Sequence, residues 1–167
     1  VSSYVLTNEE KARRAKSQRE ITRIKNPVSE EYSALRGSLL PGLLETLGRN
    51  TRHPYPQRLF EVGEVVVKDA ETETRTRTDL QASVVAAHSE TGLSEAASVL
   101  AILAHAVGRN IVLERASHPH FIEGRCAAVH EGGSPGGERL GFVGEFAPEV
   151  LEGFGIEMPA AGFELTV

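Results

Sequence analysis

The sequence is poor in the residues that build covalent or metal-based sites. Among its 167 residues Cys126 is the single cysteine, and tryptophan is absent. One cysteine excludes an internal disulfide and a metal site assembled from several thiolates. Such sparing use of cysteine is typical of a reducing compartment, so we expect a cytoplasmic protein.

Long apolar runs and an excess of positive charge are also missing. No stretch approaches the ~20 apolar residues of a membrane-spanning helix, and none has the basic, apolar and small-residue order of a signal peptide. With 18 Lys and Arg against 23 Asp and Glu, the formal net charge is −5. This balance argues against a chain that binds polyanions over its whole surface, and we expect no membrane partner.

What is present is the composition of an ordinary globular domain. Hydrophobic residues make up 40% and charged residues 25% of the chain, and its length suffices for a sizeable core. No repeat or low-complexity linker divides it, so we expect a single domain over residues 1–167. The segments that begin at Val1 and end at Val167 are apolar and strand-like, which suggests a piece of a longer polypeptide.

Helical and extended patterns alternate along the chain. The predicted helices cover residues 9–15, 38–49, 93–107 and 148–153, with a helical turn at 30–32, and the predicted strands cover 1–6, 59–67, 81–87, 111–116, 124–130, 139–146 and 160–167. The helix at 38–49 carries a core-facing stripe of five leucines: Leu39, Leu40, Leu43, Leu44 and Leu47. Residues 59–67 are typical of a central strand. Hairpins with helices inserted between strands predict an α+β domain, with a mainly antiparallel β-sheet and helices on one of its faces.

Three helix starts are predicted from capping residues. Thr7 and Glu10 have the spacing of a capping box. Ser29 can cap the turn that follows it, and Thr91 or Ser94 can cap the helix at 93–107.

Several side chains have the chemistry of ligating or reactive sites, but each has a simpler interpretation. His118 and His120 offer two imidazoles to a metal, yet no third ligand is signalled nearby, so a polar loop is favoured. Cys126 lies among Ala and Val, which favours a buried and unreactive thiol. Arg125 can bind a phosphate or carboxylate, but a salt bridge within the sheet is the simpler interpretation. Glu145 is expected to cap the helix that follows it or to pair with an Arg.

Three further segments contain residue types found in active sites or loops. His88, Ser89 and Glu90 include the residue types of a catalytic triad, but adjacency in sequence says nothing about triad geometry. The Gly-rich run at 132–137 lacks the Lys and the Ser or Thr of a phosphate loop, so a hairpin turn is favoured. The polar run at 69–78 is expected to be a loop or a hairpin tip.

Two groups of side chains are candidates for binding a partner. The possible RNA contacts are five basic residues near the start of the chain: Lys11, Arg13, Arg14, Lys16 and Arg19. A solvated helix face is the alternative, because glutamates are interspersed among them. The possible subunit interface comprises Arg52, Tyr55 and Arg58, since rigid aromatic and arginine side chains are enriched at interfaces.

Three segments, in their order and spacing, are similar to one family along essentially the whole chain. They are NPVSEEYSALRGSLLPGLLETLGRN at 26–50, RLFEVGEVV at 58–66, and FIEGRCAAV at 121–129 followed by LGFVGEFAPEVLEGFGIEMPAAGFEL at 140–165. On these residues the chain resembles the carboxy-terminal part of the beta subunit of phenylalanyl-tRNA synthetase.

The resemblance implies a degenerate, inactive copy of the class II aminoacyl-tRNA synthetase catalytic domain. It also implies a heterotetramer of two alpha and two beta subunits, in which alpha uses ATP and magnesium to charge tRNA(Phe) with phenylalanine. The beta copy would pack against the alpha subunit and help to hold the tRNA. This segment would bind no cofactor of its own.

The residues themselves support an inactive copy. Activation of a carboxylate by ATP needs cations over the phosphates, and class II enzymes place an Arg at the end of the strand that corresponds to 59–67. Near Val67 the residues of this strand are apolar. The run from Gly153 to Glu157 resembles the third class II motif weakly, but Met158 and Pro159 follow where an Arg is needed. We therefore predict no catalytic, cofactor-binding or metal-binding residues.

Two alternatives stay open at this point. One is an autonomous RNA-binding domain that uses the basic residues near the start, which would show salt-dependent binding of tRNA. The other is an enzyme that binds ATP or an amino acid in a remnant class II site, which would show ATP–pyrophosphate exchange.

Overall fold

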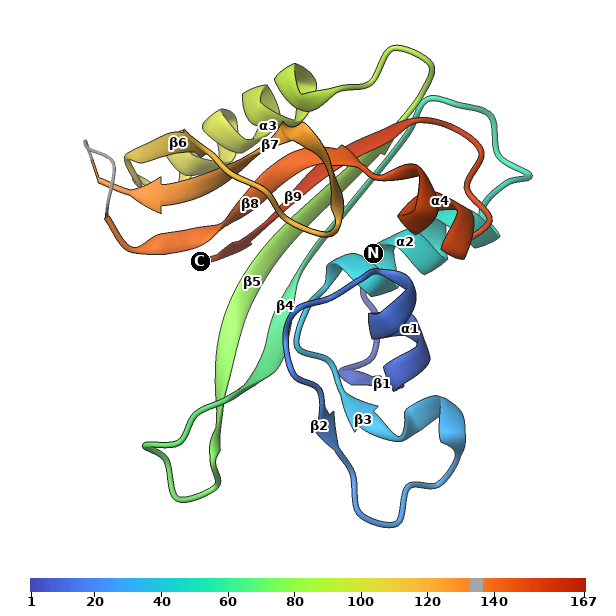
Figure 1. Ribbon diagram of the computed structural model, residues 1–167, viewed down its shortest axis with the longest axis vertical. Helices are drawn as coiled ribbons and strands as arrows, with labels where there is room; N and C mark the ends of the chain where they lie inside the picture. Colours follow the sequence, from blue (N-terminus) through green and yellow to red (C-terminus); the bar gives the residue numbers. More distant parts are fainter. Residues whose placement is uncertain (133–136) are drawn as a thin grey trace.

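The core of the molecule is one antiparallel sheet. The computed structural model describes residues 1–132 and 137–167 (Figure 1). Six strands form the main sheet in the order β4-β5-β9-β8-β7-β6, and all neighbours run antiparallel. Their bounds are β4 Gln57–Lys68, β5 Thr76–Ala87, β6 Ile111–Arg115, β7 Phe121–Glu131, β8 Arg139–Phe146 and β9 Ala160–Thr166. The predicted α+β class with a mainly antiparallel sheet is confirmed.

Strand β9 lies in the middle of the sheet and is buried along most of its length. Residues 160–165 are buried on both faces, which explains why the strand is almost continuously apolar. Gly162 allows the close pairing with β5, because a Cβ at this position would come within 2.1 Å of the Val84 carbonyl oxygen. The apolar run near the end of the chain therefore forms the centre of the sheet.

Helices cover both faces of the sheet, so the prediction of helices on one face was wrong. Ala161 packs under α3 (Leu93–Ala106), whereas its neighbour Ala160 packs with α2 (Leu40–Arg49) and α4 (Pro148–Gly153). Successive side chains of a strand point to opposite faces, so these helices lie on opposite sides (Figure 1). The sheet is apolar on both faces because each face has its own helical cover.

The leucine stripe of the second predicted helix is confirmed. Leu43, Leu44 and Leu47 of α2 are fully buried, and Leu39 and Leu40 precede them with almost no exposed surface. The helix begins at Leu40, two residues later than predicted, with Pro41 in its first turn. Among the described residues, no helix has both the length and the apolar character needed to cross a membrane.

The first 38 residues form a small unit that packs against α2 and β4. It contains α1 (Glu9–Arg14), the 3₁₀ turn η1 (Glu30–Tyr32) and a short sheet of β1 (Leu6–Thr7), β3 (Ala34–Leu35) and β2 (Thr22–Arg23). The strand predicted at 1–6 is thus reduced to two residues at Leu6–Thr7. Asn8 caps α1 by accepting from the Lys11 amide, so the predicted capping box at Thr7 was wrong.

Two other predicted caps also differ from the structure. Ser29 precedes η1 but its side chain makes no capping hydrogen bond. Helix α3 begins after Gly92 rather than at Thr91 or Ser94. Its Leu93 amide donates to the carboxylate of Glu145, which comes from β8. A carboxylate from the sheet therefore replaces the local cap.

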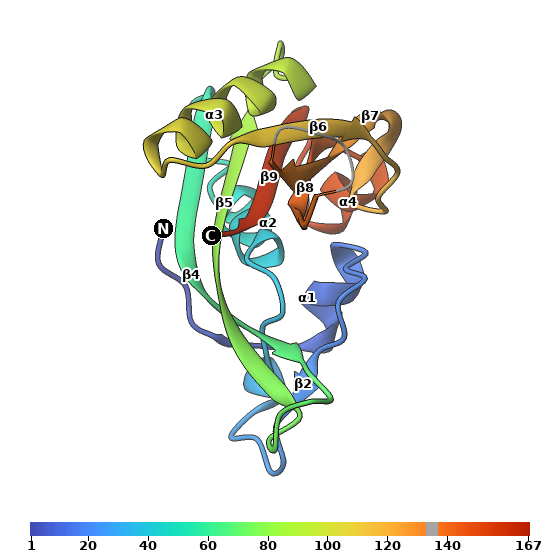
Figure 2. The same cartoon turned by 90° about the vertical axis from the view of Figure 1, so that its left-hand side faces the viewer.

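Strand β4 is an edge strand, so its prediction as a central strand was wrong. The first residues partly cover its outer edge, where the Val1 amino group donates to the Phe60 carbonyl oxygen at 2.9 Å. The β4–β5 hairpin extends away from the rest of the sheet (Figures 1 and 2). Its tip spans residues 69–75, three residues fewer than the run predicted at 69–78, because β5 already begins at Thr76. The turn predicted within 132–137 lies largely outside the described residues.

Candidate functional site: a polar cleft on the sheet

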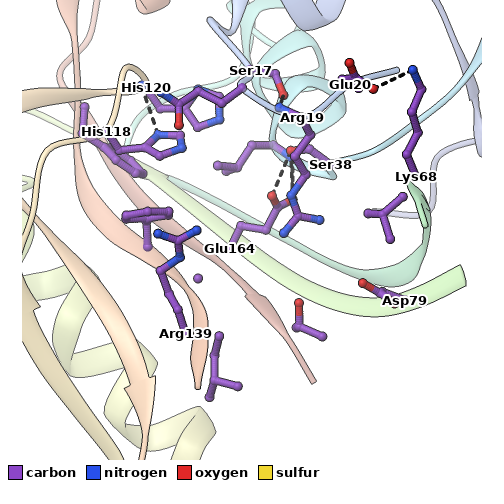
Figure 3. A pocket seen from close by; sticks show the side chains of 18 of the residues that line it. Ser17, Arg19, Glu20, Ser38, Lys68, Asp79, His118, His120, Arg139 and Glu164 are labelled. Carbon is purple, nitrogen blue, oxygen red and sulfur yellow. Dashed lines mark hydrogen bonds and ion pairs between the residues drawn. The ribbon is translucent and has the colours of Figure 1, made fainter. Parts of the chain in front are cut away.

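A cleft of about 550 Å³ lies between the main sheet and the first 38 residues. Strands β8 and β9 line one side of it, the ends of β4 and β5 line another, and the loop around Arg19 closes it (Figure 3). Strand register places the side chains of Phe142 and Glu164 on this face, because these two residues lie opposite each other in β8 and β9.

Glu164 lies at the bottom of the cleft and is almost completely buried. Its carboxylate accepts hydrogen bonds from the Ser38 hydroxyl at 2.9 Å and from the amides of Leu39 and Leu40. These amides belong to the start of α2, where the helix dipole favours an anion. Burial raises the pKa of Glu164, while the nearby Arg19 guanidinium and these donors oppose the rise. The Glu164 carboxylate, which comes from strand β9, therefore caps the start of α2.

Arg19 reaches from the loop after α1 toward Glu164. Its Nη1 donates to the Gly37 carbonyl oxygen at 3.0 Å. The Gln81 side-chain amide lies between Arg19 and Glu164. In the orientation that satisfies both neighbours, the Gln81 amide nitrogen donates to Glu164 Oε1 at 3.1 Å, and the Gln81 amide oxygen accepts from Arg19 Nη2 at 2.8 Å. Arg19 and Glu164 are thus joined through Gln81, and the positive charge of Arg19 is balanced within the cleft.

Two more cations at the rim are paired with carboxylates. Lys68 Nζ lies 2.6 Å from Glu20 Oε2, and Arg77 Nε lies 2.8 Å from Asp79 Oδ1. Arg139 differs, because its guanidinium lies 5.0 Å above the ring of Phe142 and no carboxylate in residues 1–132 or 137–167 forms an ion pair with it. The end of β4 has the apolar Val67 where the class II pattern has an Arg, but Arg19, Lys68, Arg77 and Arg139 bring cations to this face from other positions.

The two predicted loop histidines form one wall of the cleft. Burial lowers the pKa of His118 to about 3 and that of His120 to about 4. The His118 ring lies 4.3 Å from Phe142 and 4.4 Å from His120, and His120 Nδ1 bonds to the Ala15 carbonyl oxygen. Among the described residues, no group of three or more His, Cys, Asp or Glu is arranged to hold a metal ion. The pair therefore anchors the segment after α1 to the sheet.

The five predicted RNA contacts do not form one free basic patch. Lys11 pairs with Glu45 at 2.9 Å, Arg13 and Arg14 both pair with Glu10, and Lys16 pairs with Glu149 at 3.4 Å. Arg19 lies in the cleft, as described above. Contact between these residues and RNA stays a prediction, and it would have to compete with these carboxylates.

The three predicted interface residues lie around the start of β4. Arg52 is exposed, Tyr55 packs partly against the core, and Arg58 pairs with Glu95 of α3 at 2.9 Å. These positions neither support nor exclude an interface, so their role stays a prediction.

Other candidate side chains have structural roles. Arg125 pairs with Glu145 at 2.5 Å, so the salt bridge expected for both residues is confirmed, although Glu145 caps α3 rather than α4. Cys126 is buried, and burial raises the pKa of its thiol to about 11. His88 Nε2 lies 2.6 Å from Glu95, with neither Ser89 nor Glu90 completing a triad.

Sequence reasoning missed Glu164 and Arg139, the two residues that define the cleft most clearly. A signal for Glu164 was available, because an acidic residue inside an apolar strand must find donors when it is buried. Arg139 gives no such signal, since an arginine at the start of a strand is usually solvated, and its position over the Phe142 ring follows only from the fold.

The fold and the cleft define an α+β domain with a polar, internally charge-paired site on one face of an antiparallel sheet. The chain belongs to the family described as the phenylalanyl tRNA synthetase beta chain CLM domain, whose model matches residues 1–167.

Curated relatives carry a consistent name. The chain is 42% identical to the phenylalanine–tRNA ligase beta subunit of Thermococcus kodakarensis over 146 residues, which are 87% of this chain and 25% of that protein. It is 40% identical to the beta subunit of Korarchaeum cryptofilum over 169 residues, covering 100% of this chain and 30% of that protein. It thus spans 25% to 30% of the length of these relatives. The carboxy-terminal placement and the class II-like fold are not shown by these comparisons.

Proposed function

We propose that this chain is a non-catalytic module of a phenylalanine–tRNA ligase beta subunit. In this proposal it packs against the catalytic alpha subunit and supports the charging of tRNA(Phe), within an assembly of two alpha and two beta subunits in the cytoplasm. ATP and magnesium act in the alpha subunit, and the fold descends from a class II catalytic domain. The family match and the name of the curated relatives support this role.

The proposal that the module is non-catalytic rests on the charge pairing in the cleft. A triphosphate needs several cations whose charge is not already neutralised. Lys68 and Arg77 form ion pairs with carboxylates, and Arg19 is balanced by Glu164 through Gln81. Among the described residues of the cleft, Arg139 is the one Lys or Arg whose charge is not balanced by a carboxylate, so it alone could bind a phosphate. A single arginine cannot hold a triphosphate in place.

The experiment is ATP–pyrophosphate exchange by the assembled ligase. Replacing Arg139 with Ala in this chain, alone or together with Arg77→Ala, should leave kcat/KM for ATP within about twofold of the unmodified enzyme, because the alpha subunit supplies the phosphate-binding groups. A matched change outside the cleft, Arg115→Ala on the exposed strand β6, gives the baseline. A tenfold loss confined to the cleft variants would show that this face takes part in adenylate formation.

The two alternative functions receive less support. A remnant ATP site conflicts with the paired cations of the cleft. An autonomous RNA-binding domain conflicts with the carboxylate partners of Lys11, Arg13, Arg14 and Lys16. Binding of tRNA by this chain without the alpha subunit, weakening steeply as salt rises, would favour that second alternative.

A further inference from the structure

Strand β8 has a local irregularity that brings Arg139 to the cleft. Val129 of β7 lies opposite Gly141 of β8. The next residue of β7, His130, lies opposite Arg139, so one step along β7 spans two steps along β8. An extra residue of this kind is a β-bulge, which re-aims the side chains beside it. Arg139 and Phe142, three positions apart in the strand, therefore both line the cleft instead of pointing to opposite faces.

The Arg139 guanidinium has no carboxylate partner. Its central carbon lies 5.0 Å from the centroid of the Phe142 ring, and no hydrogen bond or ion pair is drawn at its nitrogens in Figure 3. Glu138 precedes it and also borders the cleft, but within the described ranges the two side chains form no ion pair. Residues 133–136 contain neither Asp nor Glu. The planar fork of N–H donors is therefore available to an anion.

His118 adds an uncharged donor on the same wall. The His120 amide donates to His118 Nδ1 at 3.3 Å. Burial lowers the pKa of His118 to about 3, so the ring is neutral and carries its one proton on Nε2. In the part of the chain that the structure describes, Nε2 has no hydrogen-bond partner. The His118 ring lies 4.3 Å from that of Phe142, and it extends with Arg139 into the cleft (Figure 3).

This set of donors fits a carboxylate better than a phosphate. A carboxylate has one negative charge and two coplanar oxygens, which match the fork of an arginine. A phosphate monoester carries close to two negative charges at neutral pH and needs more than one cation. The other cations of the cleft are already balanced, Lys68 and Arg77 by ion pairs and Arg19 by Glu164 through Gln81. One guanidinium and one neutral N–H remain for a ligand.

The size of the cleft favours a free small molecule over a side chain of the remaining polypeptide. The chain spans 25% to 30% of the length of its relatives, so an Asp or Glu from the rest of the beta chain is the competing source of a carboxylate. The cleft measures about 550 Å³, which is within the range of small-molecule sites. One acidic side chain would fill only a small part of this space.

We propose that the cleft binds a small monocarboxylate, whose two oxygens accept from the Arg139 fork and from His118 Nε2–H. The uncharged body of the ligand lies inside the cleft. This site goes beyond the proposed function and does not depend on it, because the carboxylate is bound without being activated by ATP. Glu138 at the rim competes with the ligand for Arg139.

Ligand-observed fluorine NMR with the purified full-length beta chain tests the site. The probes are fluoroacetate and para-fluorobenzoate, a small and a larger monocarboxylate, with para-fluorobenzamide as the neutral control of matched shape. We expect at least one acid to bind saturably with a Kd of about 1 mM or lower, and the amide not to bind. Para-fluorophenyl phosphate should bind no more tightly than the acids. Absence of saturable binding by both acids, or tighter binding of the phosphate, would overturn the inference and leave the proposed function untouched.

Substitutions distinguish a shaped site from attraction by charge alone. Arg139→Lys keeps the charge but loses the fork, so we expect binding to weaken about tenfold. His118→Phe keeps an aromatic ring beside Phe142 but removes the donor, which should weaken binding about fivefold. Glu138→Gln removes the competing carboxylate and should tighten binding about twofold. The matched control is Arg115→Ala on β6, which should leave the Kd unchanged. Equal Kd values for Arg139→Lys and the unmodified chain would contradict the proposed site.

Thermal unfolding separates a free ligand from an acidic side chain of the same polypeptide. For an open site, Arg139→Ala should abolish the rise in Tm that the bound probe causes. Without the probe it should lower Tm by no more than about 2 °C, the cost of its lost contact with Phe142. A larger loss of Tm without the probe, together with an unmodified chain that binds neither acid, would show that a carboxylate of the remaining polypeptide already occupies Arg139, and the inference would fail.

Discussion

Arg36 and Glu61 form a buried ion pair between the first 38 residues and the edge of the main sheet. Arg36 Nη1 lies 2.7 Å from Glu61 Oε1, and both side chains are nearly inaccessible to solvent. The Ser3 hydroxyl donates to Glu61 Oε2 at 2.8 Å, and Arg36 Nε donates to the Glu64 carbonyl oxygen at 2.9 Å. Gly63 makes room for this arrangement, because a Cβ there would come within 2.5 Å of Arg36 Nη2.

The first prediction concerns this pair. Glu61→Ala should lower the free energy of unfolding by about 3–5 kcal/mol, because it leaves the Arg36 charge buried without a partner. The double variant Arg36→Met, Glu61→Leu should recover most of that loss, since it removes both charges and fills the space. Chemical denaturation measures both values, and Glu71→Ala at the exposed hairpin tip is the control. A double variant as unstable as Glu61→Ala would show that the unpaired charge is not the cause.

The second prediction concerns Glu164. Removing its carboxylate in Glu164→Ala takes the cap from α2 and the balancing charge from Arg19, so we expect a loss of roughly 3 kcal/mol. Hydrogen exchange gives a local readout, because the amides of Leu39 and Leu40 lose their acceptor. Their exchange should accelerate more than that of amides in α3. Equal protection of Leu39 and Leu40 in the variant would contradict the capping role.

The third prediction compares two glycines. Gly162→Ala should destabilise the chain by about 2 kcal/mol or more, because the new Cβ would lie 2.1 Å from the Val84 carbonyl oxygen and the strands β5 and β9 would have to separate. Gly37→Ala should change stability by less than about 1 kcal/mol, since its nearest neighbour is 3.5 Å away. Denaturation midpoints measure both, and similar losses at the two positions would refute the argument.

The fourth prediction concerns pH. His118 and His120 have pKa values of about 3 and about 4 in the folded chain, below the ordinary imidazole value of 6.5. Between pH 6.5 and pH 4 the unfolded chain binds protons that the folded chain does not. Stability therefore falls as pH falls through this window, by up to about 1.4 kcal/mol per pH unit for each histidine, and this contribution levels off below about pH 3.

A histidine variant isolates this effect from the carboxylates. His118→Gln should flatten the fall of the unfolding free energy between pH 6.5 and pH 4, while His105→Gln on the exposed side of α3 should leave it unchanged. The lowered pKa of Glu61 adds a separate loss of stability at more acidic pH, because the Arg36 and Ser3 hydrogen bonds outweigh the effect of its burial. An unchanged slope in His118→Gln would show that this ring does not resist protonation.

Local periodicity predicted the elements well, because it depends on neighbours in the chain. The leucine stripe of α2 and the bounds of α4 could be predicted from spacing and Pro signals alone. The position of β4 at the edge of the sheet could not be predicted in this way. An edge strand with exposed Phe60 and Val62 has the same apolar pattern as a buried central strand. The second helical layer was missed because β9 is apolar on both faces, and sequence alone does not show which helix covers each face.

The cleft could be predicted only in part, because its charges come from distant segments. The apolar residue at the end of β4 was visible in the sequence, but Arg19 and Arg139 reach the same face from loops and strands about 120 positions apart. Glu164 and Glu20, the carboxylates that balance Arg19 and Lys68, are also far from them in the sequence, so spacing gave no sign that these two cations are neutralised. We therefore attribute the expected lack of ATP binding to the pairing of the cleft cations with carboxylates, and not to an absence of arginines from the cleft.

Equilibrium binding of magnesium–ATP by the purified full-length beta chain, without the alpha subunit, tests the central claim most directly. The account predicts no saturable binding up to about 1 mM, the upper end of usual substrate affinities, with or without Arg139→Ala. Saturable binding in the micromolar range that Arg139→Ala or Arg77→Ala abolishes would contradict it, because the triphosphate would then be held by cations that the structure pairs with carboxylates and aromatic rings.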